Sequence, residues 1–136
     1  MMLETAIIHQ TIQLPQTPSA AFKVFTEASA HQSLVDLPCH IEARVGGGFE
    51  VGEDMISGQF LEIVPDRKIR LKWRINLYDW PKDHYSLLTI ELHESGTGTR
   101  VELQQTGIPS RAREFVDKGW HAYYWEPMRK KSRAAS

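Results

Sequence analysis

Apolar and polar residues alternate along most of the chain, and this period of two predicts β-strands. The alternation is clearest over residues 68–75, where Trp73 and Ile75 end an apolar row and the intervening side chains are basic. Glycine-containing turns at 46–48 and 96–98 separate runs of this kind. The same pattern predicts further strands over residues 6–14, 39–45, 49–51, 56–64, 85–93 and from 101 onward.

Two short helices are expected after the first strand. Thr17 can cap the first helix, and Pro18 suits the first helical position because its missing N–H has no partner there. Residues 29–32 have the form of a capping box that starts at Ser29, so the second helix is expected to run from there to Asp36.

A long amphipathic helix is predicted at the C-terminal end, with Ser110 as its cap. Pro127 predicts a kink or an end near residues 124–126, and the basic residues 129–133 are expected to fray. One face of this helix carries an apolar stripe, formed by Ala112, Phe115, Val116, Gly119, Trp120, Tyr123 and Pro127.

This order of elements predicts an α+β fold. An antiparallel sheet with one apolar face must be covered, and the C-terminal helix is the only element large enough to cover it. We therefore expect one domain over residues 1–136, with a curved sheet of about six to seven strands wrapped around that helix. The space between sheet and helix is the first candidate site.

Composition and charge narrow the class of protein. The 136 residues are 41% hydrophobic and 24% charged, and no apolar run is long enough for a transmembrane helix or a secretory signal. Net charge is −1, but it changes from −7 over residues 1–66 to +2 over 67–109 and +4 over 110–136. This balance argues against a dedicated nucleic-acid binder. Cys39 is the single cysteine, which excludes an internal disulfide and makes a reducing cytoplasm the expected location.

Several short motifs along the chain resemble those of one known family. The chain is similar to the C-terminal domain of the activator of heat-shock-protein-90 ATPase, within the START-like, helix-grip (SRPBCC) superfamily. The resemblance covers almost the whole chain. The matching segments are Gly-Gly-Phe at 47–49, Ile-Ser-Gly at 56–58, the strand 69–74, Asp-Trp-Pro at 79–81, His-Tyr-Ser at 84–86, Gly-Thr at 98–99, Val-Glu-Leu at 101–103, Thr-Gly-Ile-Pro at 106–109, Gly-Trp at 119–120 and Tyr-Tyr at 123–124.

The resemblance implies a helix-grip fold of the Bet-v-1-like type and two classes of function. Eukaryotic members of the family are co-chaperones that combine this domain with a separate N-terminal domain. A chain of 136 residues has no room for that second domain, so full co-chaperone activity is not expected. The wider superfamily binds small molecules in the cavity, and a few members are cyclases. Relatives often carry an aromatic residue where this chain has Leu34 and Val35, which implies an altered end of the cavity.

The candidate ligand site lies between sheet and helix. The alternative to a ligand cavity is a solid core, because aromatic side chains that recur at helical spacing usually pack against neighbouring core residues. Gln105, Tyr123 and Tyr124 are the polar groups expected to orient a ligand. The residues expected to line a cavity are Phe49, Phe60, Trp73, Leu88, Ile90, Gln105, Phe115, Trp120, Tyr123 and Tyr124.

A candidate partner surface lies on the opposite face of the sheet. Arg70, Lys72 and Arg74 form a basic row there, which either pairs with acids such as Glu91 or Glu102 or docks an acidic partner. Trp80 lies in the loop after this strand, where it either anchors an interface or covers the end of the sheet.

Catalytic and metal-binding signals are weak. The six histidines lack ligand spacing and are expected to be scattered over the surface and loops, so no metal or cofactor is predicted. Cys39 is expected to be an inert core thiol. His40, Glu50 and the tyrosines are the available general acids or bases, and none forms a recognisable constellation.

Three functions remain open at this stage. The first is a non-enzymatic protein that binds an apolar or amphipathic small molecule between sheet and helix. The alternative is a stress-related, co-chaperone-like module that contacts the 90-kDa heat-shock protein through its outer face. A polyketide-cyclase-like enzyme is the third.

Overall fold

The computed structural model describes residues 3–135, with side chains through Lys131. Within that part of the chain, one antiparallel sheet holds seven strands in the order β1-β7-β6-β5-β4-β3-β2. The predicted fold class is confirmed. The strands are β1 (Thr5–Leu14), β2 (Cys39–Ile41), β3 (Gly48–Val51), β4 (Ile56–Val64), β5 (Lys68–Ile75), β6 (Ser86–Ser95) and β7 (Gly98–Pro109).

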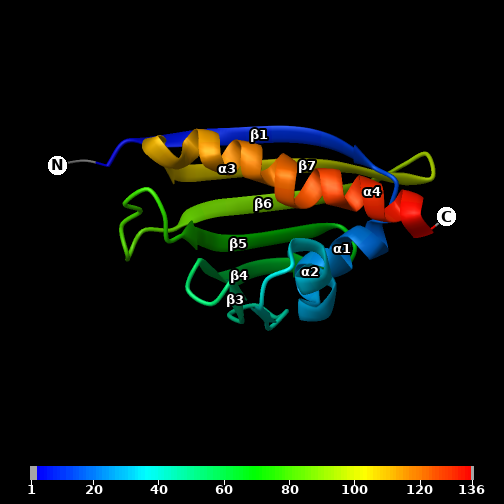
Figure 1. Cartoon of the computed structure of the whole chain (residues 1–136), viewed down its shortest axis with the longest axis horizontal. Helices are drawn as coiled ribbons and strands as arrows, with labels where there is room; N and C mark the ends of the chain where they lie inside the picture. Colours follow the sequence, from blue (N-terminus) through cyan, green and yellow to red (C-terminus); the bar gives the residue numbers. More distant parts are fainter. Residues whose placement is uncertain (1–2, 136) are drawn as a thin grey trace.

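Helical segments cover the concave face of this sheet (Figure 1). The first two, α1 and α2, follow β1, and the remaining four run consecutively after β7. Their bounds are α1 (Pro18–Thr26), α2 (Ala28–Val35), η1 (Ser110–Ala112), α3 (Arg113–Trp120), η2 (His121–Trp125) and α4 (Glu126–Ala135). None of the helices between residues 3 and 135 is both long and apolar enough to cross a membrane.

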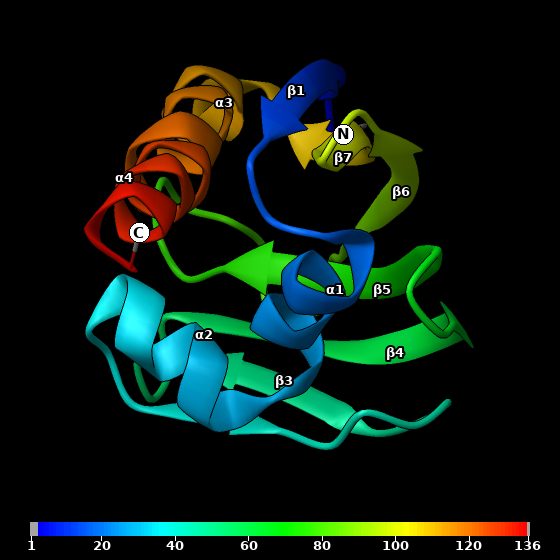
Figure 2. The same cartoon turned by 90° about the vertical axis from the view of Figure 1, so that its right-hand side faces the viewer.

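The sheet is strongly curled. Figure 2 shows it passing from β1 through β7 and β6 to β5, β4 and β3, with α3 and α4 along the open side of the curl. Gly58 in β4 permits close contact between strands, because a Cβ atom there would lie 1.9 Å from the carbonyl oxygen of Lys72. A register shift between Phe60 and Glu62 adds a second irregularity to the same strand. Both features favour bending at β4.

Two local predictions for the first half of the chain are wrong. Helix α2 begins at Ala28 with Glu27 as its N-cap, so Ser29 does not start a capping box. Glu27 also ends α1, and this tight connection fixes where α2 begins. Strand β2 ends at Ile41 instead of continuing to residue 45, because the chain turns back at 44–47. The cap on α1 is confirmed: the Ala20 amide donates to the Thr17 hydroxyl at 3.2 Å.

The C-terminal helix is long but not uniform. Ser110 opens a 3-10 turn and does not cap the α-helix, which begins at Arg113. The irregularity expected from Pro127 is the π-helical turn η2, which ends two residues before that proline. A π turn accommodates a residue that cannot donate to the preceding turn. The helix then continues to Ala135 instead of fraying from residue 129, and buried Met128 anchors this last part.

Two buried glutamines attach this helix to the sheet. Gln10 of β1 donates to the carbonyl and side-chain oxygens of Asp117 and accepts from the indole of Trp125 at 2.7 Å. Gln105 of β7 accepts from the indole of Trp120 at 2.9 Å. Buried hydrogen bonds of this kind orient a helix more strictly than apolar packing does. They fix which side chains of the helix face the sheet.

Candidate functional site

An apolar pocket of about 340 Å³ lies between the C-terminal helix and the concave face of the sheet. It occupies the end of the sheet at which β3 turns into β4 and β5 ends, whereas α1 and most of α2 cover the rest of the concave face and only Val35 at the end of α2 reaches the pocket. Its volume is within the range typical of small-molecule sites. The residues that line it are Val35, Leu37, Val51, Met55, Ile56, Trp73, Ile75, Leu77, Phe115, Val116, Gly119, Trp120, Tyr123 and Tyr124.

Half of the expected lining residues face this pocket. The structure brings together Trp73, Phe115, Trp120, Tyr123 and Tyr124 around it. Tyr123 lies at the rim, because its side chain is 56% exposed, and so it is not the buried member of the helix stripe. Its neighbours Tyr124 and Trp125 are buried instead. Tyr124 follows Trp120 by four residues and so lies on the same side of the helix, and the wider π turn brings Trp125 to that side as well.

The other expected lining residues lie outside the pocket, in the packed core, and the aromatic ones are covered by the short helices. There, His31 of α2 packs edge-on against Phe49 with ring centroids 5.3 Å apart, and Phe49 meets Phe60 at 6.0 Å. Phe25 of α1 stacks on Tyr124 at 5.6 Å. These rings fill a part of the space between sheet and helix where a cavity was expected. The residues that the structure places outside the pocket are Phe49, Phe60, Leu88, Ile90 and Gln105.

Aromatic rings form the inner wall of the pocket. The indoles of Trp73 and Trp120 lie 6.2 Å apart, and Trp120 lies 4.8 Å from Tyr124. A chain of buried hydrogen bonds fixes this wall: Trp120 donates to Gln105, which donates to Ser86, whose hydroxyl donates to the carbonyl of Trp73. The side chain of Gln105 is therefore committed to Trp120 and does not face a ligand.

A buried histidine supports the wall from behind. His31 is fully buried, contrary to the expectation that the histidines are scattered over the surface. Its Nδ1 lies 2.9 Å from the carbonyl oxygen of Val24, which only accepts, so Nδ1 carries the proton. Burial lowers the pKa of His31, so the ring is neutral and its Nε2 accepts from the Tyr124 hydroxyl at 2.9 Å. Burial also raises the pKa of Tyr124, which keeps that hydroxyl protonated.

The candidate acid–base residues lie away from the pocket. His40 and Glu50 are both exposed, and neither lines the pocket. Cys39 is half-buried, and its thiol donates to the carbonyl of Leu37 at 3.2 Å. Burial raises the pKa of this thiol, which favours its unreactive form. Among the side chains that the structure describes, no three metal-ligating groups lie together.

The mouth of the pocket is apolar as well. Met55, Leu77 and Tyr123 line the pocket and are each more than one third exposed. Tyr78 packs against Phe115 at 5.1 Å beside this opening. Exposed apolar groups that gather at a cavity are typical of a binding site.

The basic row on the outer face is shorter than expected. Arg70 and Lys72 are accessible there, but Arg74 is buried and donates to the carbonyl of Trp80 at 3.0 Å. Trp80 is 4% exposed and packs on Trp73 at 5.9 Å, so it covers the end of the sheet and is no exposed anchor. The turn at 76–80 folds over the end of β5 and buries both side chains.

The ion pairs of the outer face also differ from those expected. Lys68 and Arg70 both approach Glu62 of β4, at 3.3 and 3.7 Å, instead of pairing with Glu91 or Glu102. Arg70 lies directly opposite Glu62 in the register of β4 and β5, which brings these two side chains together.

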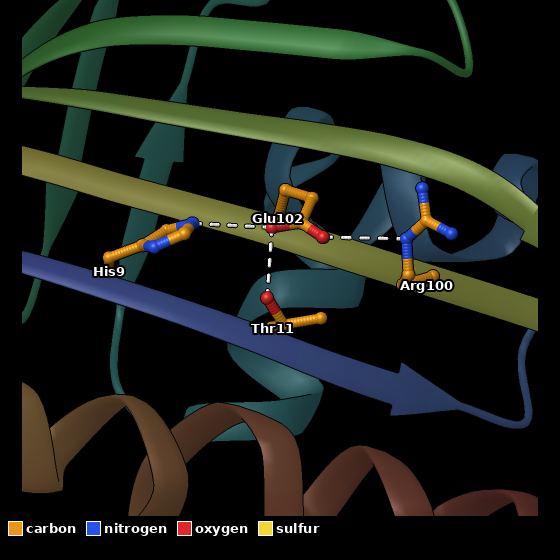
Figure 3. A network of polar contacts seen from close by, with 4 residues as sticks. All are labelled: His9, Thr11, Arg100 and Glu102. Carbon is orange, nitrogen blue, oxygen red and sulfur yellow. Dashed lines mark hydrogen bonds and ion pairs between the residues drawn. The ribbon is translucent and has the colours of Figure 1, made fainter.

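Glu102 of β7 belongs to a separate network that joins β7 to β1 (Figure 3). Its carboxylate accepts from Thr11 at 2.9 Å and contacts His9 at 3.3 Å and Arg100 at 3.4 Å. The Thr11 hydrogen bond, with help from His9 and Arg100, holds the pKa of Glu102 below its usual value.

Sequence reasoning missed much of the pocket wall. No local motif marks His31 as buried, since its partners Val24 and Tyr124 come from other helices. Val35 was singled out only as a departure from the family, and it does line the pocket. The remaining lining residues not anticipated for this site are Leu37, Val51, Met55, Ile56, Ile75, Leu77, Val116 and Gly119.

A curled seven-stranded sheet that grips a C-terminal helix around an apolar pocket defines a START-like helix-grip protein. Within that class, the chain belongs to the family described as "Activator of Hsp90 ATPase homolog 1-like protein", whose model matches residues 15–130. The resemblance drawn from the sequence motifs is therefore confirmed.

Named relatives of this family are longer proteins. The human "Activator of 90 kDa heat shock protein ATPase homolog 1" is 30% identical over 113 residues, which are 83% of this chain and 33% of that protein. A Dictyostelium discoideum homologue is 31% identical over 105 residues, covering 76% of this chain and 27% of its own length. This chain thus spans about a third of the curated relatives it matches.

Solved structures agree with the fold. An HSP90 activator from Plasmodium falciparum superposes with a TM-score of 0.81 at 26% identity, covering 87% of this chain and 89% of that one. Protein MLL2253 from Mesorhizobium loti superposes with a TM-score of 0.78 at 19% identity over 98% and 99% of the two chains. The second similarity concerns the fold alone.

Proposed function

We propose that this protein binds a small apolar molecule in the pocket between the C-terminal helix and the sheet. The observation that carries the proposal is the pocket of about 340 Å³ with an almost entirely apolar wall. Water in such a space finds few hydrogen-bond partners, so an apolar ligand that displaces it is favoured. The rigid aromatic wall of Trp73 and Trp120 supports this role, because a preformed site loses little entropy on binding.

Blocking the pocket tests the proposal. Gly119 lines the pocket, and a Cβ atom there would meet only the ring of Tyr123, at an ordinary 3.7 Å. Gly119→Leu therefore adds bulk to the pocket while it improves helix propensity by somewhat less than 1 kcal/mol. Ala122→Leu, at an exposed position of the same helix, is the matched control.

The measurement is a titration with p-xylene and 1-octanol, followed by NMR shifts of the Ile56 and Ile75 methyl groups and of the indoles of Trp73 and Trp120. We expect saturable shifts in the wild type and in Ala122→Leu, and none in Gly119→Leu. Shifts that survive in Gly119→Leu, or that are missing from the wild type, would reject binding at this pocket.

A second candidate function is association with a 90-kDa heat-shock protein. The names of the relatives favour it, since several are activators of that chaperone's ATPase. The accessible pair Arg70 and Lys72 offers a basic patch on the outer face, with Glu62 as its partial counter-charge. Such a patch would accelerate encounter with an acidic partner surface.

Charge reversal tests the second candidate. The double variant Arg70→Glu and Lys72→Glu should weaken capture of the purified chaperone, and the loss should be largest at low salt. The control reverses Lys23 and Lys130, which are exposed on α1 and α4 and give the same change in net charge. Equal capture by both double variants would reject the outer-face patch.

A further inference from the structure

We propose that the occupant of the pocket is an uncharged molecule, and that anions such as carboxylates are excluded. This inference rests on the proposed function, and it narrows the ligand from apolar or amphipathic molecules to neutral ones. Three observations carry it: the composition of the wall, the state of the buried histidine behind it, and the groups at the mouth.

The wall offers no counter-charge. None of the described side chains that line the pocket is a lysine, arginine, histidine, aspartate or glutamate. The polar groups of the inner wall are already paired, since the Tyr124 hydroxyl is bonded to His31 and the Trp120 indole to Gln105. A charged group inserted here would lose its hydration without gaining a partner, which is strongly unfavourable.

The histidine behind the wall does not supply a cation. Its Nδ1–H donates to the carbonyl of Val24, and its Nε2 accepts from Tyr124, so both nitrogens of the neutral ring are satisfied. A proton on Nε2 would reverse this hydrogen bond, so that the Tyr124 proton loses its acceptor, and would place a charge in a fully buried position. His31 therefore positions Tyr124 in the wall and remains neutral.

The mouth does not favour an anionic head group either. Met55, Leu77 and Tyr123 form an apolar rim, so a head group that remained in water there would lie beside apolar side chains. Glu53 and Asp54 are exposed and directly precede Met55 in the turn at the mouth, and their charge repels an anion. An amphipathic anion with its chain inserted is thus disfavoured at both ends.

Three probes with the same chain and different head groups test the proposal: 1-octanol, octanoate and octylammonium. At pH 8 the acid and the amine are both ionised, because their pKa values lie well to either side of that pH. Calorimetry or the NMR titration above gives the three affinities, and Gly119→Leu identifies the binding that takes place in the pocket. Shorter and longer alcohols add a second readout, since each buried methylene is expected to raise affinity about fourfold.

We expect 1-octanol to bind at least about tenfold more tightly than octanoate, with all pocket binding lost in Gly119→Leu. Octylammonium should bind more tightly than octanoate, because Glu53 and Asp54 attract a cation, but still more than about threefold more weakly than 1-octanol, because the wall offers it no partner. Octanoate or octylammonium that binds within about threefold of 1-octanol, and is blocked by Gly119→Leu, would overturn the neutral class but leave the pocket's binding role intact. If no probe binds the wild type, both the neutral class and the proposed function are rejected.

Discussion

The two ends of the concave face carry the same kinds of residue, but one end is filled by side chains and the other holds a pocket. At one end, Phe25 and His31 of the short helices meet Phe49 and Phe60 of the sheet, and the space is filled. At the other end, Trp73 and its neighbours face α3 across a pocket of about 340 Å³. The apolar pattern of a strand determines which face is buried, but not whether the space above that face is occupied.

The covering elements explain the difference. Helices α1 and α2 lie towards one end of the strands (Figure 1) and bring buried Phe25 and His31 over it, and only Val35, the last residue of α2, reaches the pocket. The helix segment over the other end presents Gly119, which has no side chain to insert, beside half-buried Phe115. Small residues on a covering helix thus leave space that aromatic residues would fill.

The largest expected effect is on stability at the filled end. Phe60→Ala should lower the free energy of unfolding by about 3–5 kcal/mol, because Phe60 is fully buried among packed rings. Phe115→Ala, at the pocket, should lower it by only about 1 kcal/mol, since its side chain is half-buried and borders empty space. Urea denaturation measures both values, and equal losses would mean that the two ends are packed alike.

Enlarging a side chain, instead of truncating it, should also destabilise the filled end more than the pocket. Ile90→Phe at the filled end should destabilise the protein by about 1–3 kcal/mol through overpacking. Ile75→Phe lines the pocket and has room for the ring, so its effect should remain within about 0.5 kcal/mol. Thermal and urea unfolding of the pair provide the comparison, and a similar loss in both variants would indicate that the pocket is not hollow.

The pH dependence of stability should reveal the buried histidine. Burial holds the pKa of His31 in the folded protein below its ordinary value of 6.5, so below pH 6.5 the unfolded chain binds a proton that the folded chain does not. Stability should therefore fall as pH decreases from about 6.5 towards the folded-state pKa, by at most about 1.4 kcal/mol per pH unit. Above pH 6.5 this contribution does not change.

His31→Gln should remove that slope, whereas His93→Gln, at an exposed position, should leave it unchanged. The readout is the slope of the unfolding free energy between pH 5 and 7, which does not depend on how far either substitution shifts stability overall. A slope that persists in His31→Gln would assign it to another group.

The smallest expected effects are on the outer face. Arg70→Ala removes an ion pair with Glu62 in which both side chains are more than one third exposed. Its effect on stability should therefore be below about 1 kcal/mol, and it should decrease further in 0.5 M salt. A loss comparable to that of Phe60→Ala would contradict the assignment of stability to the concave face.

Much of this fold is present in the sequence as pattern. The alternation over residues 68–75 correctly predicts that Trp73 faces the interior, and the helix stripe correctly includes Val116 and Trp120. Family motifs add the topology, which local pattern does not contain. The predicted cavity residues are divided between a real pocket and a filled core, because their fate depends on Phe25 and His31, which lie far away in sequence.

Where the sequence pattern predicted the wrong exposure of a side chain, the cause is local and physical. Tyr123 was expected on the buried stripe with Trp120, but it lies exposed at the rim of the pocket, and the π turn at 121–125 brings Trp125 to the buried side next to Tyr124. Arg74 continues an alternating basic row, yet the 76–80 turn folds over it and supplies the carbonyl of Trp80 as its partner. Both differences arise from backbone events that neither strand nor helix periodicity encodes.

Xenon binding tests the central claim, a hollow apolar pocket at one end of the concave face, most directly. Xenon enters empty apolar cavities without requiring a hydrogen bond. In a xenon-pressurised crystal we predict a bound atom among Trp73, Ile75 and Gly119, and none between Phe49 and Phe60. The absence of xenon beside Gly119, with the aromatic side chains closed over that space, would contradict the account.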